Sequence, residues 1–168
     1  NDMLMFSRNG MENRESILVK QLLNELEHSV EMPVEKNAVK VNFDYGLNEH
    51  FYISGNRNLL VSGLNNLLNN AIHAIDTEGE VHIKVSQPIS GSVDFTIKDN
   101  GRGIEPSSID KIFQPFYTTK ENGTGLGLAV VKAIANAHDG ELWLDQTDAF
   151  GTVFRMRLPT QIQRFNKS

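Results

Sequence analysis

A row of asparagines in the segment Leu64-Asn65-Asn66-Leu67-Leu68-Asn69-Asn70-Ala71-Ile72-His73 has the composition of a ligand-binding stripe. At about 100° per residue, Asn66, Asn70 and His73 lie together on one face of a helix. Asparagine is a poor helix former, so this row costs helix stability. Amide oxygens can ligate Mg²⁺, and amide and imidazole N–H groups can bind phosphate oxygens. Taken alone, the stripe is better explained as a solvated helix face.

A second candidate is the segment Asp99-Asn100-Gly101-Arg102-Gly103-Ile104. Asp99 has the parity of the apolar strand residues before it, Val93, Phe95 and Ile97, so it is expected to point toward the apolar side of a sheet. A carboxylate there needs hydrogen-bond donors, and an exocyclic amine such as adenine N6 would provide one. The two glycines permit close approach of a ligand. An ordinary turn at the strand end is the alternative.

A third candidate is the glycine run Gly123-Thr124-Gly125-Leu126-Gly127-Leu128, which opens an apolar helix. Clustered glycines let backbone N–H groups and a helix N-terminus face an anion. The run is not a Walker A loop, because no Gly-Lys-Ser/Thr follows it, and it lacks the spacing G-x-G-x-x-G. By itself, such a glycine-rich loop has low specificity.

The segment Ile112-Phe113-Gln114-Pro115-Phe116-Tyr117-Thr118-Thr119-Lys120 lies between the second and third candidates. Its composition suggests a mobile cover that brings Lys120 and the hydroxyls of Thr118 and Thr119 to phosphates when it closes. For its aromatic residues we favour a packing role that holds the loop on the core. For Lys120 a solvated surface charge is the alternative.

The elements that must position these residues alternate between helices and strands. Helices are expected over residues 16–31, 58–75 and 126–138, with Gly140 as the C-terminal stop of the last one. Strands are expected over 39–43, 51–53, 81–85, 93–97, 142–144 and 153–158, with a turn at 54–56 and irregular structure over 104–123. Strands with one apolar face suggest a two-layer α/β sandwich of the α+β class, a mixed sheet with helices on one face.

Composition excludes several kinds of protein. The chain has 168 residues and no cysteine, which excludes disulfides, thiol nucleophiles, zinc ribbons and iron–sulfur ligation. No apolar run approaches the roughly 18–20 residues that span a bilayer. The 16 Lys and Arg against 21 Asp and Glu give a formal charge of −5, which argues against a nucleic-acid partner. Because the chain begins in mid-pattern at Asn1, we expect a fragment of a longer protein.

The order of these segments closely resembles the catalytic, ATP-binding domain of two-component sensor histidine kinases, in the gyrase/Hsp90/histidine kinase/MutL superfamily. Residues 66–74 resemble its N box, 99–104 its G1 box, 112–120 its F box and lid, and 123–128 its G2 box, while Gly151-Thr152 resembles its terminal Gly-Thr. The resemblance covers roughly residues 16–159. The Phe-Tyr-Thr-Thr-Lys segment is similar to the lid of kinases that serve sigma-54-dependent regulators of nitrogen or flagellar genes.

The resemblance implies a Bergerat-type ATP-binding fold, with ATP and Mg²⁺ as cofactors. Asn70 would ligate Mg²⁺, Asp99 would bind adenine N6 with the support of Thr152, and Asn66 and Lys120 would act at the phosphates. His73 occupies a position where many relatives carry Lys or Arg. The nucleotide-binding residues implied are Asn66, Asn70, His73, Asp99, Gly101, Gly103, Ile104, Tyr117, Thr118, Thr119, Lys120, Gly123, Thr124, Gly125, Leu126, Gly127, Leu128 and Thr152.

Asn66 indicates phosphoryl transfer rather than hydrolysis. Where hydrolysing branches of the superfamily typically carry a glutamate that activates water, an amide cannot act as a general base. His138 is the one histidine followed by an acidic residue, and we interpret it as a helix stop near the surface. The expected acceptor is therefore a histidine on a dimerisation domain outside this chain.

This interpretation divides the chain into residues 1–14, the end of a dimerisation helix and a linker, residues 15–160, the catalytic domain, and residues 161–168, a polar tail. The expected partners are the kinase's own dimerisation domain and a response regulator, and the full-length protein is expected to be a cytoplasmic-facing homodimer, soluble or membrane-anchored. The alternative is a nucleotide-sensing module that acts through a protein partner without catalysis. A chaperone-like ATPase of the same superfamily is disfavoured by Asn66.

Overall fold

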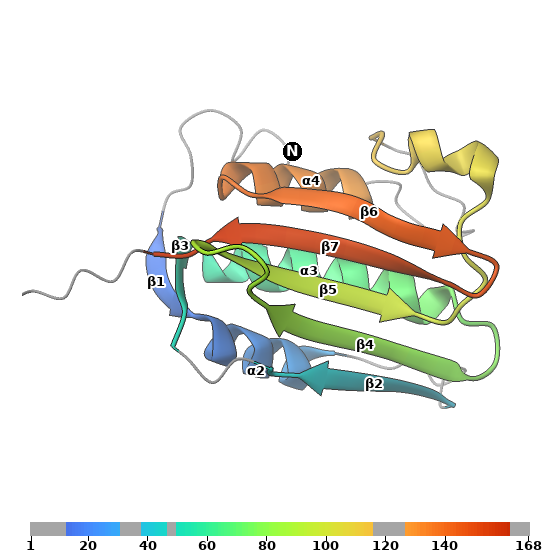
Figure 1. The fold of residues 1–168 in the computed structure, drawn as a ribbon, viewed down its shortest axis with the longest axis horizontal. Helices are drawn as coiled ribbons and strands as arrows, with labels where there is room; N and C mark the ends of the chain where they lie inside the picture. The colour runs from blue at the N-terminus through green and yellow to red at the C-terminus, as the bar shows by residue number, and fades with distance from the viewer. Residues whose placement is uncertain (1–12, 31–37, 47–49, 116–126, 162–168) are drawn as a thin grey trace, which may run out of the picture.

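Five strands form a mixed sheet in the order β2-β4-β5-β7-β6 (Figure 1). Their bounds are β2 Val39–Asp44, β4 Gly79–Ser86, β5 Ser92–Asp99, β6 Glu141–Asp148 and β7 Gly151–Pro159. The pair β2–β4 is parallel and the other three pairs are antiparallel. This computed structural model describes residues 13–30, 38–46, 50–115 and 127–161. Five of the six expected strands thus lie in one mixed sheet, and the sixth, expected over 51–53, corresponds to β3 (Tyr52–Gly55) of a separate two-stranded sheet.

Three helices cover one face of this sheet: α2 Val19–Ser29, α3 Arg57–His73 and α4 Gly127–Ala137 (Figure 1). Alternation along the strands explains the layering, because every second residue of β4 and β5 points to the helices and is buried. Phe95, for example, is fully buried in β5. The predicted two-layer sandwich with helices on one face is confirmed.

The long helix α3 carries the asparagine row. It begins after Asn56, whose Oδ1 accepts a hydrogen bond from the N–H of Leu59 at 3.0 Å, as expected for an N-cap residue. Its leucine face packs into the core, as the spacing predicts: Leu60, Leu64, Leu67, Leu68, Ala71 and, just beyond the helix, Ile75 are all buried. This face fixes the rotation of α3 and therefore the direction of its asparagines.

The first predicted helix is wrong at its start. Residues Glu15–Leu18 form strand β1, which pairs antiparallel with β3 (Tyr52–Gly55), and α2 begins only at Val19. The pairing places Ile17 opposite Ile53, and both side chains are buried, so a tertiary contact outweighs the helical spacing of the leucines. The predicted turn at 54–56 is wrong for its first two residues, because Ser54 and Gly55 belong to β3.

Both ends of the described chain meet at this small sheet. The hydroxyl of Ser16 donates a hydrogen bond to the side-chain oxygen Oε1 of Gln161. The backbone N–H of Gln161 donates a second one to the carbonyl of Tyr52 at 2.6 Å. Thr160, beside it, bonds to Gly91 at the start of β5. The chain therefore enters and leaves at the end of the molecule opposite Asp99, which closes β5.

The end of α4 differs from the prediction in its stop residue. Asp139, not Gly140, takes the left-handed conformation, with φ of 61°, and the N–H of Gly140 then bonds to the carbonyl of Ala135 at 2.8 Å. Gly140 is required for another reason, because a Cβ there would overlap the carbonyl oxygen of Arg157 in β7.

His138 was expected near the surface and is instead buried, with 3% of its surface exposed. Its Nδ1 lies 2.7 Å from the carbonyl of Ile134, and its Nε2 lies 3.1 Å from the N–H of Asn56. The imidazole thus joins the end of α4 to the start of α3, and this pairing is what keeps a polar ring in the core. Burial lowers the pKa of His138 below its ordinary value.

The stretch expected to be irregular contains a short 3-10 helix, η2, over Pro106–Lys111. Proline in its first turn is compatible with such a start, because its missing N–H would have no partner there. Among the described residues, none of the helices is both long and apolar enough to cross a membrane.

Candidate functional site

Asp99 ends β5 with its side chain turned to the apolar side of the sheet, as its parity predicts, and only 5% of it is exposed. Its Oδ1 accepts a hydrogen bond from the N–H of Gly101 at 2.8 Å, and the backbone N–H of Thr152 donates to the same carboxylate. Burial raises the pKa of Asp99, while these two bonds and the charge of Arg102 oppose the rise. A buried carboxylate held in this way is suited to accept a hydrogen bond from a ligand amine.

Close backbone contacts bring the surrounding loops to Asp99. A Cβ on Gly101 would overlap the carbonyl of Ala74 at the end of α3, and a Cβ on Gly103, where φ is 79°, would lie even closer to the carbonyl of Asp148 at the end of β6. Gly151 approaches the carbonyl of Asp99 itself. The loop after β5 is therefore confined between α3 and the β6–β7 turn, with no room for larger residues.

The asparagine row runs toward the same end of the sheet. Asn66 and Asn70 are half-buried on α3, and the helix ends at His73, beside the loop after β5. Arg102 of that loop donates its backbone N–H to the carbonyl of Ala74 at 3.0 Å and its Nη1 to the carbonyl of His73 at 3.2 Å. These bonds hold the carboxylate and the amide row at one end of the fold.

The imidazole of His73 is exposed and lies against its own helix, with Nδ1 2.7 Å from the carbonyl of Asn69. Among the described residues, no three His, Asp or Glu side chains cluster as metal ligands. The amide oxygens of the α3 asparagines are oxygen ligands of the kind that Mg²⁺ accepts.

Helix α4 runs antiparallel to α3, since His138 beyond its C-terminus contacts Asn56 at the start of α3. Gly63 of α3 faces Val131 and Ile134 of α4. At about 1.5 Å rise per residue, the N-terminal turn of α4, with Gly127 and Leu128, then lies alongside the later turns of α3 that carry the asparagines. A helix N-terminus at this position favours an anion.

Part of the predicted site lies outside the described residues. This part comprises Tyr117, Thr118, Thr119, Lys120, Gly123, Thr124, Gly125 and Leu126. Most of the segment 1–14 that was expected to end a dimerisation helix, residues 1–12, also lies outside the described residues. Of the predicted lid, the aromatic Phe113 is described. It packs edge-on against Phe154 of β7, with ring centroids 6.2 Å apart, and the ammonium of Lys132 lies 4.7 Å from its ring. The packing role expected for this aromatic is confirmed.

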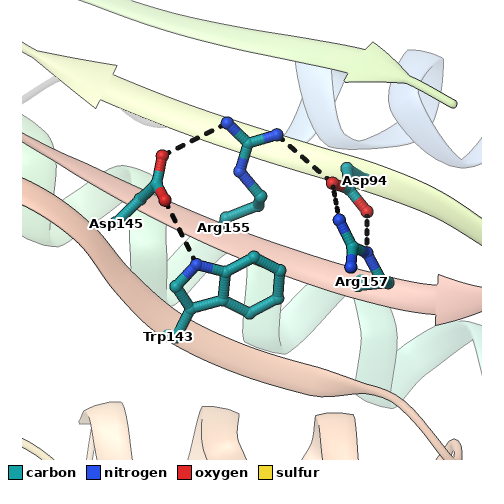
Figure 2. A network of polar contacts seen from close by, with 5 residues as sticks. All are labelled: Asp94, Trp143, Asp145, Arg155 and Arg157. Carbon is teal, nitrogen blue, oxygen red and sulfur yellow. Dashed lines mark hydrogen bonds and ion pairs between the residues drawn. The ribbon is translucent and has the colours of Figure 1, made fainter. Parts of the chain in front are cut away.

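The sequence analysis missed two polar features. Thr147 of β6 bonds through Oγ1 to the hydroxyl of Thr152 at 2.9 Å and accepts the N–H of Ile104 at 3.0 Å. Asp94, on the opposite face of the sheet, is fully buried between Arg155 and Arg157 (Figure 2). Both residues lie at positions that the alternation of apolar residues assigns to the exposed face of a strand. Asp94 could have been suspected because two arginines occupy alternate positions of a later strand.

Fold and site together define a nucleotide-binding α/β domain with a buried carboxylate at the end of a central strand. Residues 55–162 match the family of histidine kinase-, DNA gyrase B- and HSP90-like ATPases, and the chain belongs to this family. This is an ATP-binding family, and the resemblance to the catalytic domain of sensor histidine kinases is confirmed.

The chain is 41% identical over 116 residues to signal transduction histidine-protein kinase AtoS of Escherichia coli K12, which covers 69% of this chain and 19% of AtoS. It is 34% identical over 146 residues to sporulation kinase A of Bacillus subtilis, covering 87% of this chain and 24% of that kinase. The chain thus spans about a fifth to a quarter of these relatives.

Among solved structures, the catalytic domain of histidine kinase ThkA superposes with a TM-score of 0.76 at 29% identity, covering 89% of this chain and 96% of that domain. ThkA has also been solved in complex with response regulator protein TrrA.

Proposed function

We propose that this chain binds ATP with Mg²⁺ and transfers the γ-phosphoryl group to a histidine of a dimerisation domain outside residues 15–160, for relay to a response regulator. The observation that supports this most is the convergence of three groups at one end of the fold. These are the buried carboxylate of Asp99, the amide row of α3 and the N-terminal turn of α4. The TrrA complex of ThkA supports the relay partner.

The nucleotide fits the residues around Asp99. The carboxylate would accept a hydrogen bond from the adenine amine, while the backbone N–H of Thr152 holds the carboxylate in place. The glycines at 101 and 103 keep the loop backbone close, where a Cβ would fill the space. Asn70 would ligate Mg²⁺, with Asn66 and His73 near the phosphates. Mg²⁺, when bound, supplies charge neutralisation for the phosphates.

The predicted cover supplies the remaining groups of the proposed site. Tyr117, Thr118, Thr119 and Lys120 would close over the phosphates, with Lys120 neutralising charge. Gly123, Thr124, Gly125 and Leu126 would pass along the phosphates into Gly127 and Leu128 at the start of α4. Positioning and charge neutralisation of this kind are what phosphoryl transfer requires.

The acceptor is proposed to lie outside these residues. His138, which alone is followed by an acidic residue, is buried and bonded at both ring nitrogens, so it cannot accept a phosphoryl group without unfolding the end of α4. Asn66 cannot act as a general base, so slow hydrolysis is expected in the absence of the acceptor domain.

Nucleotide selectivity tests the role of Asp99. Guanine presents an acceptor oxygen where adenine has its amine, and an unpaired buried acceptor costs about 1–3 kcal/mol, roughly 5–150-fold in affinity. Calorimetry should therefore show ATP bound more tightly than GTP, and Asp99→Asn should weaken ATP by a similar factor. Equal affinities for the two nucleotides would remove this role from Asp99.

Two further measurements test the metal and the reaction. In calorimetry, Asn70→Ala should abolish the Mg²⁺-dependent part of the ATP affinity, whereas equal Mg²⁺ dependence in both proteins would refute the metal assignment. Mixing the chain with labelled ATP and a dimerisation domain that carries the acceptor should produce phosphohistidine. Tight ATP binding without phosphohistidine would instead identify a nucleotide-sensing module.

A further inference from the structure

Strand β6 changes its alternation halfway along. Leu142 and Leu144 point to the helices, opposite Met156 and Phe154 of β7. The register then shifts between Leu144 and Gln146, so that Asp145 is an extra residue. Without this bulge, the odd-numbered Thr147 would point away from the helices. With it, Thr147 pairs with Thr152 and turns to the same side as Asp99.

The extra residue is fixed by a polar network on the outer face of the sheet (Figure 2). Asp145 accepts hydrogen bonds from Arg155 Nη2 and from Trp143 Nε1, each at 3.2 Å. Arg155 Nη1 also donates to Asp94 at 3.2 Å. The Arg157 guanidinium, 2.7 Å from Asp94, lies 5.1 Å from the centre of the Trp143 ring. Asp145 is thus bonded to Arg155 of the neighbouring strand β7, and Arg155 connects it to Asp94 of β5, the next strand in the sheet.

Thr147 uses its orientation to connect two parts of the nucleotide site. It accepts a hydrogen bond from the N–H of Ile104, which ends the loop after β5 (residues 100–104, here called the glycine loop), and it bonds to the hydroxyl of Thr152. The backbone N–H of Thr152 in turn donates to Asp99. We propose that Thr147 is a positioning residue, turned inward by the Asp145 bulge, that holds the glycine loop and Thr152 in the arrangement Asp99 needs for adenine. This inference rests on the proposed function.

Four variants separate this role from general packing. Thr147→Val keeps the shape and removes both hydrogen bonds, whereas Thr147→Ser keeps the hydroxyl. Thr96→Val makes the same chemical change on the outer face of β5 and serves as the matched control. Asp145→Ala releases the bulge from Arg155 and Trp143 and changes no residue of the pocket.

Thr147→Val is expected to weaken ATP binding about two- to tenfold, the value of one or two ordinary hydrogen bonds, and to lower the ATP-to-GTP affinity ratio. It should also speed hydrogen exchange at the Ile104 amide. Thr147→Ser and Thr96→Val should stay within about twofold of the original chain in all three measurements. Asp145→Ala should change them in the same direction as Thr147→Val, by a smaller factor.

The affinity ratio and the Ile104 exchange rate are decisive, because uniform loss of stability would not change nucleotide selectivity. Unchanged selectivity and exchange in Thr147→Val would overturn the proposal. Should that variant not fold, the same two measurements on Asp145→Ala decide, and wild-type values there overturn it. If the original chain bound no ATP, the proposed function would be refuted instead. Hydrogen exchange at the Ile104 amide would then still test whether Thr147 holds the loop.

Discussion

Acidification should destabilise the fold through His138. Nε2 of the ring accepts a hydrogen bond from the backbone N–H of Asn56, and Nδ1 lies next to the carbonyl oxygen of Ile134. The neutral form with its proton on Nδ1 therefore satisfies both contacts. A second proton would place two donors face to face. Burial is the main cause that lowers the pKa of His138, the charge of Arg14 lowers it further, and the Ile134 bond and Asp139 oppose the shift.

The sign and size of the effect follow from linkage. Because the pKa is lower in the folded chain, the unfolded chain binds more protons below its own histidine pKa of about 6.5. The stability that neutral His138 contributes is complete above that pH and decreases as pH falls toward the folded value. One proton accounts for at most about 1.4 kcal/mol per pH unit over this interval.

Urea unfolding between pH 5 and 8 measures this slope. His138→Phe should be less stable at pH 8 by about 1–3 kcal/mol, because the Asn56 N–H loses this acceptor. It should also lose the His138 part of the slope. His82→Gln, at an exposed position of β4, is the matched control and should retain the slope. If the original chain and His138→Phe show the same slope below pH 6.5, the reasoning is refuted.

Three further predictions concern other contacts. Gly101→Ala should lower both the melting temperature and the ATP affinity, because its Cβ would overlap the backbone carbonyl of Ala74, and unchanged calorimetry and melting would contradict this. Asp94→Asn should cost about 1–3 kcal/mol in urea unfolding, less than the 3–5 kcal/mol of a fully buried ion pair because its two arginine partners are about a quarter exposed. Asn56→Ala should cost about 1 kcal/mol through the lost cap of α3, and an unchanged unfolding midpoint would rule out that capping role.

The sequence predicted most of the fold because alternation and helical spacing agree with burial over long segments. The leucine face of α3 and the inward residues of β4 and β5 occupy the expected sides. The parity of Asp99 correctly predicted a buried carboxylate. These features depend on residues close together in the chain, which is the information that a local pattern holds.

Several of the errors share one physical cause, which is contact between residues outside the local segment. Strand β1 exists because Ile17 pairs with Ile53, and His138 is buried because Asn56, 82 positions away, donates to it. Thr147 was missed because one inserted residue, Asp145, reverses the alternation that would have located it. None of these contacts has a signature in its own segment.

The hydrogen bonds of Gln161 to Ser16 and Tyr52 have a practical consequence for building hybrid proteins. They anchor the two ends of the folded unit side by side, beyond the first residue of β5, whereas Asp99 ends that strand. Seven residue steps at about 3.4 Å separate the two positions by about 24 Å. A module fused next to Ser16 or Gln161 would therefore lie at the end of the sheet opposite Asp99, which suits the unit between these residues to exchange as a cassette between hybrid proteins.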